Sequence, residues 1–282
     1  MIKFAKVFVC IGVFLSFGYS DAQKSMPVGE LRDDQTNKPI VYACLIFTKT
    51  TYGTTSNEQG RFFLQVDSTL LQEKVRISCI GYHSKVLPCY KLSNKTIYLS
   101  PKMDALAQKY VYDPENKQPS RTINPFSGKE WVGLGNFSGG AYPSVLARYY
   151  PNDFKGDKKH DLDQGTIFFN PPYHVSSKFK LRVLGASDDL SPAETLLLSN
   201  LIVQSEKNNR KVQVSLADYG IQVPENGFFI DVEPLFIHEN RFEEQFDIRI
   251  GDTVYQDVST IRYGPVLWGV QEQEEPEEVR LL

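Results

Sequence analysis

The sequence predicts an all-β protein with two antiparallel β-sandwiches in series, and three observations support this. Apolar runs are short, and turn-forming residues separate many of them, with 16 Pro and 19 Gly in the chain. Turn signals recur at roughly the 8–12-residue spacing that is typical of sandwiches. The 282 residues provide room for two domains, because domains commonly have about 100–150 residues.

Composition and charge exclude several classes of protein. With 41% hydrophobic and 23% charged residues, the chain is neither collagen-like nor wholly disordered. The 31 basic and 34 acidic residues give a net charge of −3. No basic excess is available to hold phosphate backbones, so we expect no nucleic-acid partner.

Residues 1–22 have the pattern of a secretory signal peptide. Lys3 and Lys6 form a positive start, an apolar run follows at residues 7–17, and Ser20-Asp21-Ala22 supplies small residues for cleavage. A membrane anchor is the weaker alternative, because a crossing helix needs about 20 apolar residues. We therefore expect an exported protein (periplasmic, outer-membrane-associated or secreted) with no transmembrane segment after cleavage.

The first domain is predicted at residues 27–112 and contains several short strands. Residues 75–80 alternate apolar and polar positions, as a half-buried strand does. Residues 57–60 form a tight turn. The other predicted strands are residues 40–48, 61–66, 84–87 and 96–99.

Four segments of this domain, in order and spacing, resemble the carboxypeptidase-like regulatory domain. They are Gly29 with residues 37–43 (NKPIVYA), then residues 53–62 (GTTSNEQGRF), 75–82 (VRISCIGY) and 97–101 (IYLSP). The resemblance implies a small transthyretin-like or immunoglobulin-like sandwich of seven strands. In metallocarboxypeptidases this domain is a non-catalytic appendage, so the resemblance implies no catalytic residue.

The cysteines that remain after cleavage are Cys44, Cys79 and Cys89. Their odd number leaves at least one thiol without a partner in the chain. Cys79 alternates with apolar residues and is predicted to face the core, whereas Cys44 alternates the other way. A bridge between those two is therefore not favoured, and we expect small buried or half-buried thiols.

The second half begins with a Pro-rich linker, predicted at residues 113–129, followed by a second domain at residues 130–270. We expect this domain to be another antiparallel sandwich, with a jelly-roll as one form. Residues 192–204 are predicted as a short turn leading into a strand. The last segment, residues 271–282, has five Glu and is predicted to be a disordered acidic tail. The expected strands are residues 166–170, 178–185, 211–216, 227–237 and 245–250.

No catalytic or cofactor motif is present in the sequence. The four His lack the close spacing of a zinc site, and no nucleophile elbow, P-loop or dinucleotide fingerprint occurs. Aspartates at 157, 161 and 163 are weak candidates for a calcium loop. The twelve-residue calcium pattern fails there, because Lys158 and Lys159 interrupt it. We therefore predict no catalytic residue, no cofactor and no metal.

Aromatic residues are dense around residues 142–173. Phe168 and Phe169 are expected in the core, because such rings are usually buried. Tyr149, Tyr150 and Tyr173 are the better candidates for an exposed platform that stacks on a sugar or a peptide.

Two functions from different classes follow. The first is an exported, non-catalytic protein of a bacterial envelope that binds protein or glycan through loops and sheet edges. The alternative is a hydrolase or peptidase-accessory protein whose site is a carboxylate pair in the second domain, which leaves no linear motif. Two carboxyl groups converging in a cleft would favour the enzyme, and a flat aromatic face would favour the binder. A structural spacer is a third possibility.

Overall fold

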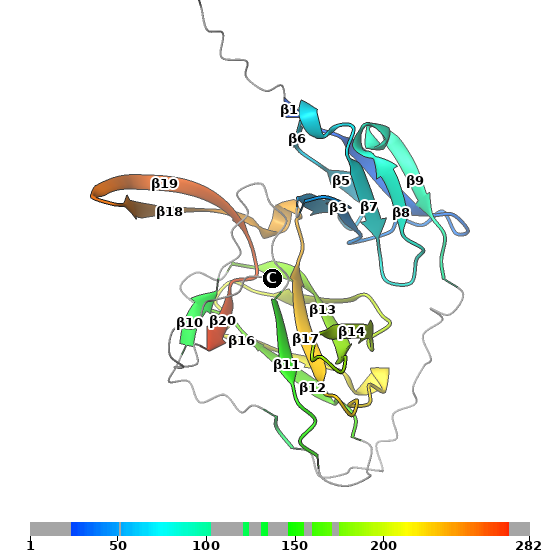
Figure 1. Ribbon diagram of the computed structural model, residues 1–282, viewed down its shortest axis with the longest axis vertical. Coiled ribbons are helices and arrows are strands. Elements are labelled where there is room, and N and C mark those ends of the chain that lie inside the picture. Colours follow the sequence, from blue (N-terminus) through cyan, green and yellow to red (C-terminus); the bar gives the residue numbers. More distant parts are fainter. Residues whose placement is uncertain are drawn as a thin grey trace, which may run out of the picture.

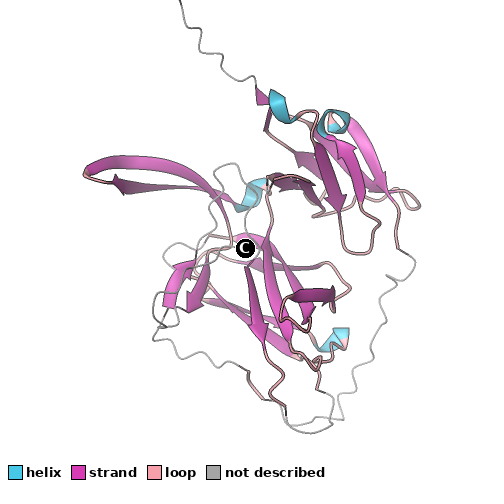
Figure 2. Cartoon of the chain, viewed as in Figure 1, coloured by secondary structure: helices cyan, strands magenta, loops and turns pink. Residues whose placement is uncertain are grey.

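The computed structural model describes residues 24–50, 52–102, 121–123, 131–134, 146–154, 160–170 and 175–270. The regular secondary structure of the described residues is almost entirely β-strand, as Figure 2 shows, and this confirms the predicted all-β class. Short 3-10 turns interrupt it at η1 (Ser68–Leu70), η2 (Cys89–Leu92), η4 (Ala217–Tyr219) and η5 (His238–Asn240). The predicted signal peptide, most of the linker and the acidic tail lie outside the described residues.

The N-terminal part is a sandwich of a three-stranded and a four-stranded sheet (Figure 1). Together they have seven strands, the number that the family resemblance implies. The first sheet has the order β5 (Arg61–Phe63), β2 (Val28–Asp33) and β9 (Lys95–Leu99). The second has the order β4 (Gly53–Thr55), β3 (Cys44–Phe47), β7 (Lys74–Ser78) and β8 (Lys85–Pro88). A short pair, β1 (Lys24–Ser25) with β6 (Val66–Asp67), lies beside them.

Apolar side chains from both sheets fill the space between them. Alternate residues of each strand point inward, so that Leu45 and Phe47 of β3 meet Phe62 of β5 and Leu99 of β9. These four side chains are almost fully buried. Burial of such side chains is worth about 1.5–3 kcal/mol each, which makes this core sufficient to hold the sandwich together.

The second part is also built from packed antiparallel sheets. One sheet has the order β11 (Leu146–Tyr150), β17 (Phe228–Pro234), β13 (Ser177–Ala186) and β14 (Pro192–Thr195), and β15 (Leu201–Ser205) also pairs with β13. A second layer contains the pair β12 (Gln164–Phe168) and β16 (Lys211–Ser215). A further pair joins β10 (Trp131–Leu134) to β20 (Leu267–Val270). The layers share one core, which includes Phe169, Phe179, Leu181, Val214, Phe228 and Leu267.

One element of this second part differs from the sequence-based expectation. The turn predicted at the start of residues 192–204 is wrong, because Pro192–Thr195 is strand β14. Its residues pair with the end of β13, where Thr195 lies opposite Leu184. Tertiary pairing with β13 overrides the weak helical preference of Ala193 and Glu194.

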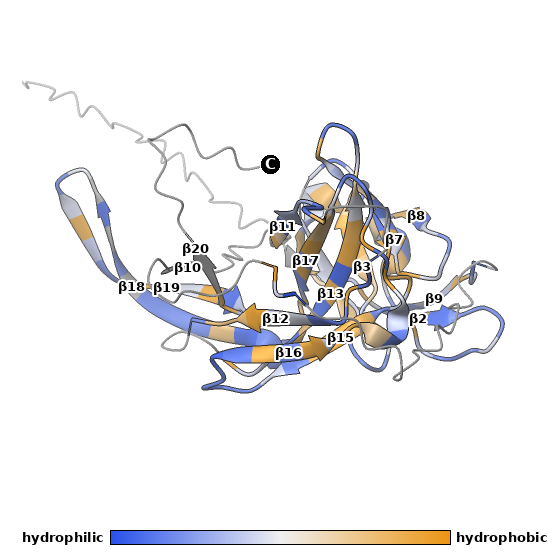
Figure 3. Cartoon of the chain, turned by 90° about the horizontal axis from the view of Figure 1, so that it is seen from below, coloured by the Kyte–Doolittle hydropathy of each residue, from blue (hydrophilic) through white to orange (hydrophobic). Residues whose placement is uncertain are grey.

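A long two-stranded ribbon, β18 (Arg241–Ile250) with β19 (Thr253–Tyr263), extends away from both sandwiches (Figures 1 and 3). The sequence predicted a strand only at residues 245–250. Strand β19 was missed because its residues, TVYQDVSTIRY, are mostly polar and carry no clear apolar alternation. Within the described residues, no helix has the length and apolar composition that a membrane crossing needs.

Candidate functional site: the polar junction between the sandwiches

Strands β13 and β17 carry charged residues on the sheet face opposite the core. Lys180 and Arg182 of β13 alternate with Phe179, Leu181 and Val183, which lie in the core of the second sandwich. In the register of the sheet, Lys180 lies opposite Glu233 and Arg182 lies opposite Asp231. Two cation–carboxylate pairs therefore stand side by side across the two strands.

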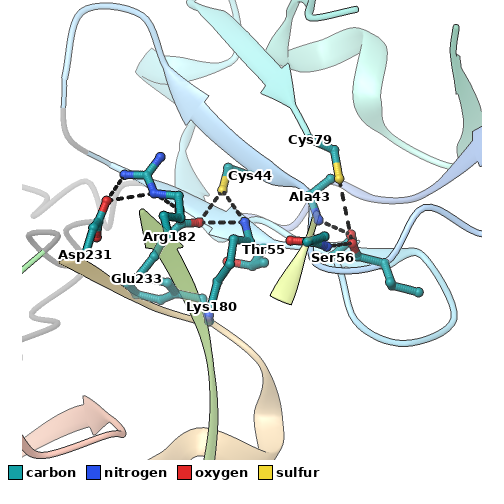
Figure 4. A network of polar contacts seen from close by, with 12 residues as sticks. Ala43, Cys44, Thr55, Ser56, Cys79, Lys180, Arg182, Asp231 and Glu233 are labelled. Carbon is teal, nitrogen blue, oxygen red and sulfur yellow. Dashed lines mark hydrogen bonds and ion pairs between the residues drawn. The ribbon is translucent and has the colours of Figure 1, made fainter. Parts of the chain in front are cut away.

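The N-terminal sandwich covers one of these pairs, as the close-up shows (Figure 4). Lys180 Nζ lies 2.9 Å from Glu233 Oε1, and the two side chains are only 3% and 5% exposed. The Cys44 thiol of β3 donates a hydrogen bond to the same oxygen, with 2.7 Å between Sγ and Oε1. Lys180 Nζ also lies 3.7 Å from Cys44 Sγ. A thiol, an ammonium and a carboxylate from the two sandwiches thus form one buried triangle.

The charges in this triangle stabilise one another. Burial alone would favour the neutral forms, but the pKa of Lys180 is raised, because Cys44 and Glu233 outweigh desolvation. The pKa of Glu233 is lowered from its usual range despite its burial, because Lys180 and Arg182 stabilise the carboxylate. Both groups are therefore charged at neutral pH.

The neighbouring pair, Arg182 with Asp231, is less well balanced. Arg182 Nε donates to Asp231 Oδ2 at 2.7 Å, and Nη2 donates to the same oxygen. The other carboxylate oxygen, Oδ1, is buried without a hydrogen-bond partner among the described residues. Desolvation raises the pKa of Asp231 to about 6, although Arg182 opposes this shift. Of the two junction carboxylates, Asp231 is therefore the one whose charge is less well stabilised.

Apolar and backbone contacts complete the junction. Tyr42 of the first sandwich forms a small buried cluster with Leu235 and Ile237, which follow β17. The Phe236 backbone N–H donates to Thr55 Oγ1 at 3.2 Å. At the rim, Lys178 of β13 forms an ion pair with Glu58. The junction therefore has a dry apolar part, a buried polar part and an exposed salt bridge.

This arrangement favours holding over catalysis. A catalytic acid or base must reach a substrate, whereas each carboxylate here is buried and paired with a cation from the neighbouring strand. The described residues contain no group of three His, Cys, Asp or Glu that could hold a metal ion. The contacts of the junction hold the two domains together.

The predicted stacking residues lie elsewhere, on the edge strand β11. Tyr149 is half-buried, packs against Phe229 with ring centroids 5.3 Å apart, and donates its hydroxyl to the Asn226 carbonyl. Tyr150 stacks on Phe228 at 5.3 Å. These two tyrosines are consecutive on β11 and face opposite sides of the sheet. Tyr150 packs against the core of the second sandwich and Tyr149 against the cluster of Leu184 and Phe229, while Tyr173 lies outside the described residues. Their role in ligand stacking stays a prediction.

The calcium candidates are only partly described. Asp161 forms an isolated backbone bridge with Gln222, and both Asp161 and Asp163 are exposed. The carbonyl of Asp163 accepts hydrogen bonds from Leu216 and Ala217, which fixes the loop against β16. Asp157 lies outside the described residues, so these atoms do not define a calcium site.

All three cysteines of the first sandwich are free thiols. Cys89 is fully buried in the core, where desolvation raises its pKa to about 11. Cys79 is half-buried, with Sγ 3.9 Å from the Val41 carbonyl. Cys44 belongs to the junction. This fits its position in β3, where it points away from the core-facing residues Leu45 and Phe47.

The junction residues were missed in the sequence for a physical reason. Charged residues at alternate positions of a strand usually mark a solvated face, and here the N-terminal sandwich covers that face. One signal was present: β13 carries Lys180 and Arg182 where β17 carries Asp231 and Glu233, at matching two-residue intervals. Complementary charges at matching intervals indicate paired strands.

Comparison with known proteins assigns the first sandwich. The model of the CarboxypepD_reg-like domain matches residues 28–111. A search of curated proteins found no match to the chain. The match covers both sheets of the N-terminal sandwich and ends before the second one. The N-terminal part of this chain is therefore a CarboxypepD_reg-like domain, as its four motif segments predict.

Proposed function

We propose that the chain is an exported, non-catalytic accessory protein of the bacterial cell envelope, and that it binds a protein partner through the ribbon β18–β19. The domain match supports the non-catalytic part, since a CarboxypepD_reg-like domain is a regulatory module without catalytic residues. The signal-peptide pattern of residues 1–22 supports export.

The projecting ribbon is the observation that carries the proposal. Strands β18 and β19 pair with each other and, within the described residues, with no other strand. The outer edge of each strand therefore offers backbone N–H and C=O groups to an added strand. Val254 and Tyr255 near the turn are 47% and 51% exposed, and Ile261 is also exposed. An isolated hairpin is only marginally stable in water, which favours a bound state in which a partner covers it.

A protein fits this surface better than a glycan does. Strand addition requires a peptide backbone, which a glycan lacks. The ribbon also carries charges of both signs, among them Arg241 paired with Glu243 and Arg262 paired with Glu244. Mixed charges along a ribbon give register and specificity to a protein contact.

The alternative function, a hydrolase, requires a pair of carboxylates in the second sandwich. Asp231 and Glu233 are two neighbouring carboxylates there. Their burial and ion pairing leave neither group directed at solvent. The structure therefore favours the binding protein over the hydrolase.

A matched pair of photo-crosslinkable variants tests the proposed contact. The full chain carries a benzophenone amino acid at Tyr255 of the ribbon or, as control, at Tyr98 of the first sandwich, which is 45% exposed. We expect a discrete protein adduct in envelope extract from the Tyr255 position and none from Tyr98. A second variant, Val254→Asp with Tyr255→Ser, is expected to lose at least tenfold in affinity for the identified partner. Equal adducts at both positions, or retained affinity, would contradict the proposal.

Export and catalysis are tested separately. N-terminal sequencing of the protein from fractionated cells is expected to begin at Gln23, outside the cytoplasm. Retention of Met1 in a cytoplasmic fraction would contradict export. Turnover of peptides or glycosides by the purified protein would contradict the non-catalytic assignment.

A further inference from the structure

We propose that Cys44 and Lys180 form an oxidative modification site, at which peroxide produces a covalent sulfur–nitrogen crosslink between the two sandwiches. The two residues come from separate domains and lie 136 positions apart in sequence, yet Nζ and Sγ are 3.7 Å apart. A covalent crosslink here would prevent the two sandwiches from separating at the junction.

Three features of the triangle suit this reaction. Glu233 Oε1 contacts both reacting atoms, at 2.7 Å from Sγ and 2.9 Å from Nζ. It therefore holds the thiol beside the amine. The long, flexible stem of Lys180 allows Nζ to approach the sulfur. Figure 4 shows the three groups meeting where β3 faces β13 and β17.

The chemistry balances with one peroxide molecule. In the first step the Cys44 sulfur attacks peroxide, the O–O bond breaks, and Cys–SH plus H₂O₂ gives Cys–SOH plus H₂O. Sulfur loses the two electrons that peroxide gains. Sulfenic acids condense with nitrogen nucleophiles. In the second step Cys–SOH and Lys–NH₃⁺ give Cys–S–NH–Lys, H₂O and a proton, which passes to solvent water. The S–O bond breaks as the S–N bond forms.

The other two thiols do not have this arrangement. The contact of Cys79 Sγ is with a backbone carbonyl, and Cys89 lies in the apolar core of the first sandwich. Among the described residues, no lysine forms a hydrogen bond to either of them. Lys180 interacts with Cys79 electrostatically, but its hydrogen bonds are to Cys44 and Glu233. Cys44 is therefore the thiol placed for condensation.

Peroxide can reach Cys44 by opening of the junction. Interfaces between domains of one chain commonly open and close, and local opening requires less free energy than global unfolding. Cys44 is 8% exposed even in the closed form. Oxidation is thus expected to be slow, and each crosslink retains the closed arrangement until a reductant breaks it.

Peptide mapping of the oxidised full chain is the test. The folded protein is treated with hydrogen peroxide, its remaining thiols are blocked, and a proteolytic digest is analysed by mass spectrometry without reductant. We expect one linked pair that contains Cys44 and Lys180, with the summed peptide mass less two hydrogens. Dithiothreitol is expected to remove it and to restore both free peptides.

Variants assign the linkage. Cys79→Ser and Cys89→Ser are expected to retain the linked pair, and Cys44→Ser to abolish it. Lys180→Arg keeps the positive charge but lacks the amine, so its Cys44 is expected to proceed to sulfinic acid. Recovery of wild-type Cys44 as a free thiol, or as sulfinic acid without the linked pair, would overturn the proposal. That outcome is read in the wild-type chain and does not depend on the folding of any variant.

Discussion

A buried lysine is tolerated at the junction because Glu233 and Cys44 surround its ammonium group. The pair lies almost completely out of solvent, so its attraction is not screened by water. Desolvation of two charges is costly, however, and a buried pair contributes little net stability compared with apolar residues of the same volume. Both charged groups belong to the second sandwich and pair across β13 and β17, so docking of the first sandwich adds the Cys44 hydrogen bond to this pair.

Removing one partner of this pair is predicted to reduce the free energy of unfolding much more than removing both partners does. We expect Lys180→Met to reduce the free energy of unfolding by about 3 kcal/mol, because Glu233 is left charged and buried. The double variant Lys180→Met with Glu233→Leu is expected to recover most of the loss. Urea unfolding at pH 7 measures both values. A double variant as unstable as the single one would show that the charges themselves are required.

The raised pKa of Asp231 predicts that this group makes the free energy of unfolding fall as the pH rises. Ordinary acid denaturation has the opposite sign, because there stability falls as the pH is lowered. Asp231 has a pKa of about 6 in the folded protein, against its ordinary value of 3.8. Between these values the folded state binds a proton more tightly than the unfolded state does, so stability falls as pH rises. The slope for this group is at most about 1.4 kcal/mol per pH unit.

Comparison with Asp231→Asn isolates this contribution from that of other carboxylates. We expect the stability of wild type, relative to Asp231→Asn, to fall as the pH is raised from 4 to 6 and to stay constant above 7. Urea midpoints across this range provide the measurement. A flat difference, or one that rises with pH, would show that Arg182 keeps the pKa of Asp231 in or below its usual range.

Secondary-structure elements in this chain were predictable where one face packs on a core and difficult where neither does. Strand β7 was predicted from apolar alternation, and β13 and β17 from the strand signals of residues 178–185 and 227–237. Strand β19 has no core-facing side, and only its pairing with β18 makes it extended. The burial of the charged face of β13 was not predicted, because the sequence of one strand does not show that Cys44 and Glu233, 189 residues apart, will meet there.

Turn geometry offers a prediction at the same scale. Gly227 precedes β17 with φ of +83°, and a Cβ there would lie 2.4 Å from the Tyr150 carbonyl. Gly251 in the ribbon turn has φ of +60° and open space around it. We expect Gly251→Ala to cost about 1 kcal/mol for the left-handed backbone. Gly227→Ala should cost a further 1–3 kcal/mol, roughly, for overpacking. Denaturant unfolding compares the two, and equal losses would contradict the close approach.

At the scale of the whole molecule, we expect the junction to couple the unfolding of the two sandwiches. Tyr42 reaches across to Leu235 and Ile237, all of them buried, and the charged triangle lies beside this cluster. Domains joined by a large apolar interface unfold together, whereas weakly joined domains unfold separately. The second sandwich therefore lends stability to the CarboxypepD_reg-like domain, and the reverse also holds.

Two optical probes can test this coupling, because both tryptophans of the chain, Trp131 and Trp268, belong to the second part. Tryptophan fluorescence then reports on the second sandwich, and far-ultraviolet circular dichroism reports on both. We expect coincident urea transitions in the wild type. Ile237→Asp buries a charge in the junction and is expected to split the circular-dichroism transition, while fluorescence follows one phase. The control Leu181→Ala creates a cavity inside the second core and should lower the midpoint of both probes together. Separate transitions in the wild type would show that the sandwiches fold independently and that the junction is a surface contact.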